Sequence, residues 1–413
     1  MSTPVRRIIA VPTAPAVTPA PRFLDLHVLQ ALPYNNVNRD DLGSPKVLTF
    51  GGVTRTRVSS QAWKRPVRLA VEESIGEKAL RTRRLPEQVF RELAQRGWPE
   101  DLAAMAGAQV IRSTETKLAL EKGDRTTASL LFLPDSAASA LADIAEEHRD
   151  VLAKALGKAA AAKPLLPKDA LHQILRSRNG SIALFGRMLA EIPGAGVDGA
   201  VQVAHAFTTH ATSVQADFFT AVDDVNQWAE DAGSAHMNTG EFSTGVFYRY
   251  ATLDLRDLAS NVAALTGPQD GTAPPTDAAY LRDAATLRDL ATAFATAFLG
   301  TVPGAKKTST APHTHPDLVY IAVRPDRPLS LAAAFEEPVR AREHGWGLPS
   351  RQALSEYATR INRLLGTTEL PYAAHAGLDD KPLTGLGAAA SSYPALIAGA
   401  VDIAYPAAAA ANA

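Results

Sequence analysis

The sequence predicts an α+β protein whose sheet follows the strand–helix–strand, strand–helix–strand order of a ferredoxin-like or RNA-recognition-motif fold. The first strand is expected at 23–32, where alternating apolar and polar side chains are typical of a half-buried strand. A second clean alternation covers 245–255, and a continuous apolar run at 318–323 predicts a buried strand. A long, mostly helical stretch at about 77–175 is expected as an insertion after the first strand.

Composition limits the kinds of chemistry that the chain can perform. It has 413 residues, enough for two or three domain-sized units, and 46% hydrophobic and 21% charged residues, as in soluble globular proteins. It has no cysteine, which excludes disulfides, zinc–thiolate sites, iron–sulfur clusters and a thiol nucleophile. We expect no cofactor and no metal.

The two ends of the chain resemble targeting signals only superficially. Prolines interrupt the short apolar run that follows Arg6 and Arg7, so 1–22 is expected to be a flexible tail rather than a signal peptide. The alanine-rich end, 386–413, is too weakly hydrophobic to span a bilayer and is expected to be a low-complexity tail. We therefore expect a cytoplasmic protein that contacts no membrane.

The remaining elements are assigned from periodicity and from residues that start or stop helices. Strand character is expected at 181–189 and a helix at 197–210. The polar stretch that follows, up to Thr244, is short of core residues and predicts a projecting arm or hairpin. A helix is expected at about 277–299, with Gly300 as its stop signal.

The near-zero net charge hides an asymmetry. Between Arg39 and Arg96 thirteen Lys and Arg face seven Asp and Glu, which gives this stretch a net charge of +6 within a chain of net charge −1. A local positive field indicates a surface for an anion, although an ordinary ion-paired helical surface has the same composition.

The strongest local candidate is the loop and helix between Arg39 and Arg68. Ser59 or Ser60 is predicted to cap the helix, whose first-turn N–H groups then favour a phosphate. Lys64 and Arg68, four residues apart, share one helix face, and this mixture of charges and neutral donors suits a phosphodiester backbone recognised without sequence preference. Pro66 disagrees with a straight helix, so we expect the helix to start later or to bend. The predicted phosphate-binding residues are Arg39, Lys46, Ser59, Gln61, Lys64 and Arg68.

Two other patterns suggest different functions. The glycines at 194–199 match G-x-G-x-x-G, with Asp217 near the distance expected of a dinucleotide site, but Asp198 fits better as an N-cap in an ordinary loop. Asp40 and Asp41 could hold Mg²⁺ for phosphodiester cleavage; the favoured interpretation is that Asp41 pairs with Arg39 or caps the turn.

Two further groups of residues carry weaker signals. Phe218 and Phe219 on the predicted arm could stack on bases or wedge between them, or could pack the arm against a neighbouring domain. The second group could form a metal site only on paper, because its spacing is wrong, and is expected to be scattered over the surface: His205, His210, Asp223, Asp224 and His236.

Ordered blocks along the chain resemble the backbone subunit of type I-E CRISPR Cascade, the CasC family. The basic helix carries one of them, Arg57-Val58-Ser59-Ser60-Gln61-Ala62-Trp63-Lys64-Arg65. Others lie at 23–29, 38–41, 51–52, 197–200, 204–210, 217–224, 233–236, 241–250 and 302–306. The stretch at 76–178 aligns only by its helical character.

The resemblance implies a right-hand-shaped subunit with an RNA-recognition-motif palm, helical fingers and a β-hairpin thumb. The implied parts are a flexible tail (1–22), palm (23–66), fingers (67–180), palm (181–206), thumb (207–244), palm with C-terminal helices (245–385) and a low-complexity tail (386–413). It also implies that Met188 contacts guide bases, that Lys306 and Lys307 contact phosphates or the target strand, and that Phe218 and Phe219 belong to the thumb.

Family members polymerise along the spacer of a CRISPR RNA, and each thumb displaces a guide base at regular intervals. The implied partners are the CRISPR RNA, the target DNA strand, other copies of the chain in a helical filament, and the large, small, guide-processing and 5′-handle-binding subunits of Cascade. The resemblance implies a scaffold rather than an enzyme. The alternative is a Mg²⁺-dependent ribonuclease of a CRISPR effector that uses Asp40 and Asp41.

Overall fold

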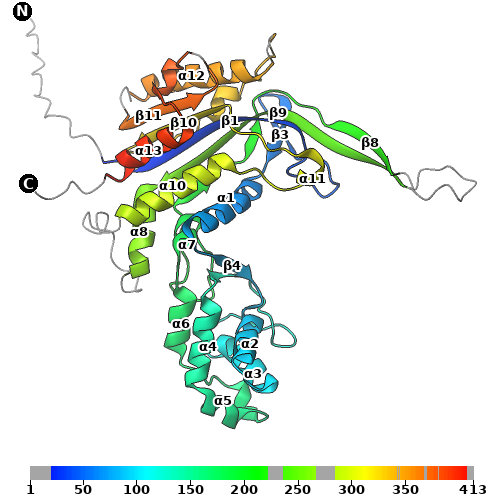
Figure 1. The fold of residues 1–413 in the computed structure, drawn as a ribbon, viewed down its shortest axis with the longest axis vertical. Coiled ribbons are helices and arrows are strands. Elements are labelled where there is room, and N and C mark those ends of the chain that lie inside the picture. Colours follow the sequence, from blue (N-terminus) through cyan, green and yellow to red (C-terminus); the bar gives the residue numbers. More distant parts are fainter. Residues whose placement is uncertain are drawn as a thin grey trace, which may run out of the picture.

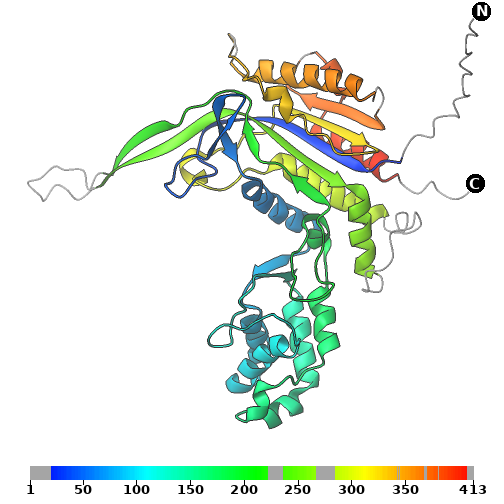
Figure 2. The same cartoon turned by 180° about the vertical axis from the view of Figure 1, so that it is seen from behind.

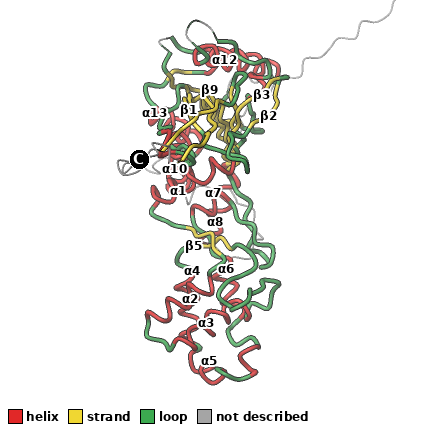
Figure 3. Tube along the Cα trace, turned by 90° about the vertical axis from the view of Figure 1, so that its right-hand side faces the viewer, coloured by secondary structure: helices red, strands yellow, loops and turns green. Residues whose placement is uncertain are grey.

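The protein has a sheet-centred upper body, a helical lower body and a long hairpin that projects to one side (Figures 1 and 2). The structure is a computed structural model, and it describes residues 20–221, 236–266, 284–341, 343, 345–366, 370–379 and 381–406. Seen from the side, the helical body extends away from the sheet along the long axis of the molecule (Figure 3).

One large mixed sheet forms the upper body. Its strands lie in the order β12-β11-β10-β1-β9-β7-β3-β2, and β6 and β8 also pair with β9. Neighbours in the main path are antiparallel except β11 and β12, which are parallel. The strands are β1 (Phe23–Asn35), β2 (Val47–Phe50), β3 (Val53–Val58), β6 (Val201–Val203), β7 (Ala206–Thr208), β8 (Gln215–Ala221), β9 (His236–Asp254), β10 (Leu318–Arg324), β11 (Tyr372–Gly377) and β12 (Ala388–Ala389).

Strand β1 is buried on both faces, so the prediction of a half-buried strand is wrong. Its apolar side chains pack under α1 (Ser60–Ile75), α10 (Ala284–Gly300) and α13 (Tyr393–Ala404). Its side chains Asp25, His27 and Leu29 lie on the opposite face, which η3 (Ala332–Phe335) and α12 (Gly347–Leu364) cover. Two contacts offset the burial of these polar side chains: Asp25 pairs with Arg324 at 3.0 Å, and His27 Nδ1 lies 2.9 Å from the Tyr248 hydroxyl.

The segments around residue 190 form the opposite elements to those expected. Residues predicted as a strand at 181–189 begin with the helix α7 (Gly180–Phe185), whose cap Asn179 accepts a hydrogen bond from the Ile182 N–H. Residues predicted as a helix at 197–210 form β6 and β7 against β9. Short apolar runs cannot distinguish helix from strand, and pairing with β9 decides the outcome here.

The lower body is a helical unit with its own hydrophobic core, as the mostly helical prediction for about 77–175 anticipates. It is joined to the sheet by a two-stranded sheet of β4 (Ala79–Thr82) and β5 (Leu131–Pro134). Its helices are α2 (Leu85–Gln95), α3 (Glu100–Arg112), α4 (Ala137–Glu147), α5 (Arg149–Ala155) and α6 (Lys168–Arg176).

The segment expected to be a low-complexity tail contains an ordered helix, α13. Its side chains Leu396, Ile397 and Val401 are buried against α10 and the sheet. Pro394 lies in the first turn of α13, where a missing N–H costs little, so it does not interrupt the helix. No helix among the described residues is long and apolar enough to cross a membrane.

Candidate nucleic-acid interface

Helix α1 forms one wall of the candidate interface, and a serine cap fixes its start. Ser59 rather than Ser60 is the cap, because the Ser59 hydroxyl accepts a hydrogen bond from the Ala62 N–H at 3.3 Å. The Ser59 N–H in turn donates to the side-chain oxygen of Asn38, which ties the helix to the preceding loop. The helix continues through Pro66, so the expected later start is wrong.

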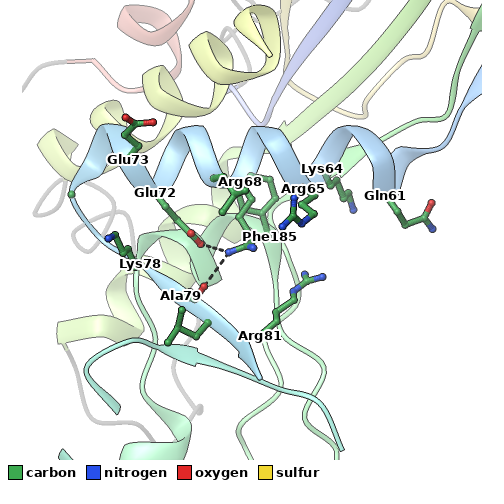
Figure 4. A pocket seen from close by; sticks show the side chains of 13 residues that line it. Gln61, Lys64, Arg65, Arg68, Glu72, Glu73, Lys78, Ala79, Arg81 and Phe185 are labelled. Atoms are coloured by element: carbon green, nitrogen blue, oxygen red, sulfur yellow. Dashed lines mark hydrogen bonds and ion pairs between the residues drawn. The ribbon is translucent and has the colours of Figure 1, made fainter. Parts of the chain in front are cut away.

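The apolar side of α1 packs into the sheet and leaves its polar side exposed. Trp63 is 1% exposed and lies in a cluster with residues of β1, β3, β7 and β9. Val67 and Val71 continue this buried stripe at helical spacing. The side chains of Gln61, Lys64, Arg65 and Arg68 therefore lie along the opposite side of the helix (Figure 4).

A groove of about 1110 Å³ runs between α1 and β4. Its cationic lining comes from two segments, with Lys64, Arg65 and Arg68 on α1 facing Lys78 and Arg81 near β4 (Figure 4). Burial, with the charge of Arg81 as a second cause, lowers the pKa of Lys64. Such crowding of like charges favours an anion in the groove.

Arg68 lies in this groove but is occupied by partners within the protein. Its side chain is 11% exposed, and its Nη1 lies 2.5 Å from a carboxylate oxygen of Glu72 and 3.0 Å from the carbonyl oxygen of Ala79. Of the two predicted cations on this face, Lys64 is the one whose charge no described carboxylate neutralises.

A second groove of about 540 Å³ continues from the first along α1, since both are lined by Gln61, Arg65 and Leu69. Its far wall is the segment from Gly300 to His315, which contributes Lys307 and two histidines. Lys306 is exposed just before α11 (Lys307–Thr310) and does not line this groove.

A third groove of about 780 Å³ adjoins the first on its other side, where both are lined by Arg81 and Phe185. Met188 lies here and is 91% exposed, an unusual position for a large apolar side chain. The adjacent Arg187 is buried and donates to carbonyl oxygens of Ala195, Ser177 and Arg176 at 2.7–3.0 Å. Burial lowers the pKa of Arg187 to about 10.

The loop before β2 brings two more predicted cations near the start of α1. Arg39 is exposed and Lys46 is partly exposed, and the Lys46 N–H donates to the Asn38 carbonyl at 3.0 Å. Asp40, not Asp41, caps the turn, because its Oδ1 accepts from the N–H groups of Leu42 and Ser44. The chain therefore uses Asp40 to shape the loop that presents these cations.

The predicted arm is a two-stranded antiparallel hairpin of β8 and the first part of β9, and it projects from the sheet (Figure 1). Phe218 is 63% exposed and Phe219 is 44% exposed. Met237, another apolar residue of the predicted arm, is 63% exposed and lies diagonally opposite Phe218 on one face of the hairpin.

The competing sites are not assembled by the fold. The glycines at 194–199 follow a helix and precede a strand, the reverse of the strand-to-helix order of a dinucleotide site. Gly199 instead allows close packing, since a Cβ there would lie 2.8 Å from backbone atoms of Phe185. Within the described residues no three His, Asp or Glu side chains converge as metal ligands. His210 is buried and stacks on Trp346, and Asp223 and Asp224 lie outside the described residues.

Sequence reasoning missed Asn38, Arg65 and Arg81 as groove residues. Asn38 and Arg65 could have been found from the sequence, since each is adjacent to a predicted phosphate-binding residue, Arg39 or Lys64. Arg81 could not, because only the folding of β4 against α1 brings it opposite Lys64.

Comparison with known proteins gives consistent results. Residues 24–395 match the family described as CT1975-like protein. A chain of a solved CRISPR RNA-guided surveillance complex in a pre-nicking state is 44% identical, with a TM-score of 0.82, and the match covers 93% of this chain and all of that chain. A chain of another CRISPR RNA-guided surveillance complex is 39% identical, with a TM-score of 0.72 and coverage of 92% and 99%. No curated protein matches the chain. The chain therefore belongs to the CT1975-like protein family, and these matches confirm the resemblance of its sequence to the backbone subunit of CRISPR Cascade.

Proposed function

We propose that the chain is the guide-binding scaffold of a CRISPR surveillance complex, and that it holds the sugar–phosphate backbone of a CRISPR RNA along α1. The observation that carries this proposal is the run of three adjoining grooves past Lys307, Arg65, Lys64, Arg81 and Met188. A polyanion lying in these grooves contacts cations without having its base edges read, as a guide requires if it is to pair with a target.

The strand order supports a palm of the RNA-recognition-motif type. The four strands β10-β1-β9-β7 lie side by side, with α1 after β1 and α10 after β9, as in the β-α-β-β-α-β motif. In this proposal the helical body is the fingers and the hairpin of β8 and β9 is the thumb. Successive copies line up along the spacer, and each thumb displaces one base while Met188 supports the neighbouring bases.

The proposal extends to the partners. Bases that remain stacked and accessible pair with the target DNA strand, and the other Cascade subunits join the filament of copies at its ends and along its side. No chemical step is assigned to the chain. The loop carboxylate of Asp40, which shapes a turn, has a structural role in this proposal.

Charge reversal in the main groove tests the proposal. Lys64→Glu and Arg81→Glu are each expected to weaken guide RNA binding equally for unrelated spacer sequences. Each lost phosphate contact is expected to make the log–log salt slope less negative by about 0.7. Arg91→Glu is the matched control, because Arg91 is exposed on α2, outside the three grooves, and among the described residues it forms an ion pair with Glu87 alone. Unchanged binding in both groove variants, or losses confined to particular spacer sequences, would refute the proposal.

A further inference from the structure

The hairpin of β8 and β9 needs an anchor, because most of its length lies beyond the main sheet. Residues 215–221 and 236–242 pair only with each other, and β9 joins β1 from Ser243 onward. A lone two-stranded hairpin is marginally stable and is free to swing about its base. Side-chain contacts at the base must therefore decide its direction.

Tyr34, at the end of β1, contacts both strands of the hairpin. Its ring stacks on that of Phe242 in β9 with 4.1 Å between centroids and 19° between planes. Partial burial, together with the nearby carboxylate of Asp217 in β8, raises the pKa of Tyr34 to about 12. Gly240 leaves room for this arrangement, since a Cβ there would lie 2.8 Å from the Phe242 ring.

Asn36 joins the hairpin to the loop that carries Arg39 and Lys46. The residue is 2% exposed, and its side-chain amide donates to the carbonyl of Gly43 at 2.8 Å and to the carbonyl of Glu241 at 2.7 Å. The Ser44 hydroxyl donates to the carboxylate of Glu241. Loop and hairpin base are thus connected by two independent contacts.

We propose that Tyr34, Asn36 and Glu241 are positioning residues that hold the arm at a fixed angle to the phosphate-binding loop, and so determine which guide nucleotide the arm displaces. This inference rests on the proposed guide-binding function. A rigid connection keeps the exposed Phe218 and Met237 at a fixed distance from the loop that binds phosphates. The displaced bases are then evenly spaced along the guide.

The absence of cysteine allows the angle to be measured in the full-length protein. Thr239→Cys on the arm and Glu356→Cys on α12, both exposed, take nitroxide labels for pulsed electron–electron double resonance. One narrow distance distribution is expected in the parent. In Asn36→Ala/Glu241→Ala, the ratio of anchored to displaced arm is expected to fall about two- to tenfold for each lost hydrogen bond. Glu241→Gln is the matched control, since an amide oxygen still accepts from Ser44.

A second measurement uses complexes assembled on one guide RNA, with base reactivity probed along the spacer. The parent and Glu241→Gln are expected to show the same regular pattern of reactive bases, and the Asn36→Ala/Glu241→Ala pattern is expected to blur. If the double variant folds poorly, both measurements are repeated on Glu241→Ala alone, which leaves the buried Asn36 in place. Unchanged distances in both alanine variants, or broadened distances with an unaltered reactivity pattern, overturn the inference. Uniform reactivity in the parent is evidence against the proposed function, and it leaves the distance measurement valid.

Discussion

The guanidinium carbon of Arg249 lies 3.8 Å from the centroid of the Trp63 ring, so an arginine from the centre of the sheet is stacked on the helix that lines the grooves. The same guanidinium lies 4.6 Å from the Phe298 ring on α10, and it donates to Gln30 on β1 and to the Phe298 carbonyl. Burial lowers the pKa of Arg249 to about 9. This contact fixes α1 relative to β1, β9 and α10.

Removing the indole from this contact is expected to destabilise the fold. Trp63→Ala should lower the free energy of unfolding by about 3–5 kcal/mol, because it leaves a cavity and exposes one side of Arg249. Urea denaturation followed by far-UV circular dichroism measures the change. Glu73→Ala, an exposed position on the same helix, should change it by less than about 0.5 kcal/mol. Equal effects of the two variants would show that Trp63 does not anchor α1.

Lys64 is expected to contribute to RNA binding alone, whereas Arg68 is expected to contribute to both RNA binding and stability. Arg68→Ala leaves the buried Glu72 carboxylate with Ser181 as its side-chain partner, so it should lower the free energy of unfolding by about 1–3 kcal/mol as well as weaken RNA binding. Lys64→Ala should weaken RNA binding with a change in stability below about 0.5 kcal/mol. Thermal unfolding measures the stability of each variant, and filter binding measures its affinity for RNA. A stability loss in Lys64→Ala comparable to that in Arg68→Ala would contradict the prediction.

Met188 is expected to act on the guide alone. With 91% of its surface exposed, Met188→Ala should leave the melting temperature within about 2 °C of the parent. Base reactivity near the displaced positions of a bound guide should nevertheless change. Leu130→Ala, at another exposed apolar position, provides the control. A large stability loss in Met188→Ala, with unaltered base reactivity, would assign Met188 a packing role.

Stability is expected to fall as the pH drops below about 6.5. Burial, assisted by Arg324, lowers the pKa of His27 well below its usual value, so the unfolded chain binds a proton at a pH where the folded protein does not. The free energy of unfolding therefore rises with pH through this window, by up to about 1.4 kcal/mol per unit for one histidine. Burial raises the pKa of Asp25, whose protonation in the folded state opposes the loss at lower pH.

Replacing the histidine tests this sign. In His27→Gln the dependence on pH between about 7.5 and 5.5 should be shallower than in the parent, because one proton-linked group is gone. Chemical denaturation at several pH values measures the two slopes. A steeper slope in His27→Gln would mean that other groups dominate this range.

Neither loop carboxylate is expected to cleave RNA, and only Asp40 is expected to shape the loop. Complementary RNA incubated with the assembled complex and Mg²⁺ should remain intact, and Asp41→Ala should leave both loop and binding unchanged. Asp40→Ala should accelerate hydrogen exchange at the amides of Leu42 and Ser44, because the oxygen that accepts from them is lost. Regularly spaced cuts that disappear in Asp41→Ala would establish the ribonuclease instead.

The elements with strong periodicity were predictable from sequence, and those decided by tertiary pairing were not. The strand at 318–323 and the stop signal at Gly300 agree with β10 and α10. The 181–189 and 197–210 segments were assigned the wrong type, because α7 fits against α1 and α8 (Leu255–Thr266) while β6 and β7 need β9 as a partner. A single sequence does not reveal a partner fifty residues away.

The groove residues of the candidate interface were predictable where they are close in sequence. The spacing of Lys64 and Arg68 placed both on the groove side of α1, but it did not show that Glu72, one further turn along, neutralises Arg68. The sequence did not show that Arg81 lies opposite Lys64, because the two residues come together only when the segment between the two bodies folds. Polar residues of β1 looked solvent-facing because alternation does not report a second layer that covers them.

Among the four buried arginines of the described residues, Arg324 pairs with Asp25, whereas the guanidinium groups of Arg55, Arg187 and Arg249 donate to carbonyl oxygens; these three affect how the molecule and a polyanion would meet. With a net charge of −1 and part of the positive charge enclosed among carbonyl oxygens, the chain exerts little attraction on a nucleic acid tens of ångströms away. The association rate constant would then be that of diffusion without electrostatic steering, and ionic strength would act chiefly on the dissociation rate of the strand.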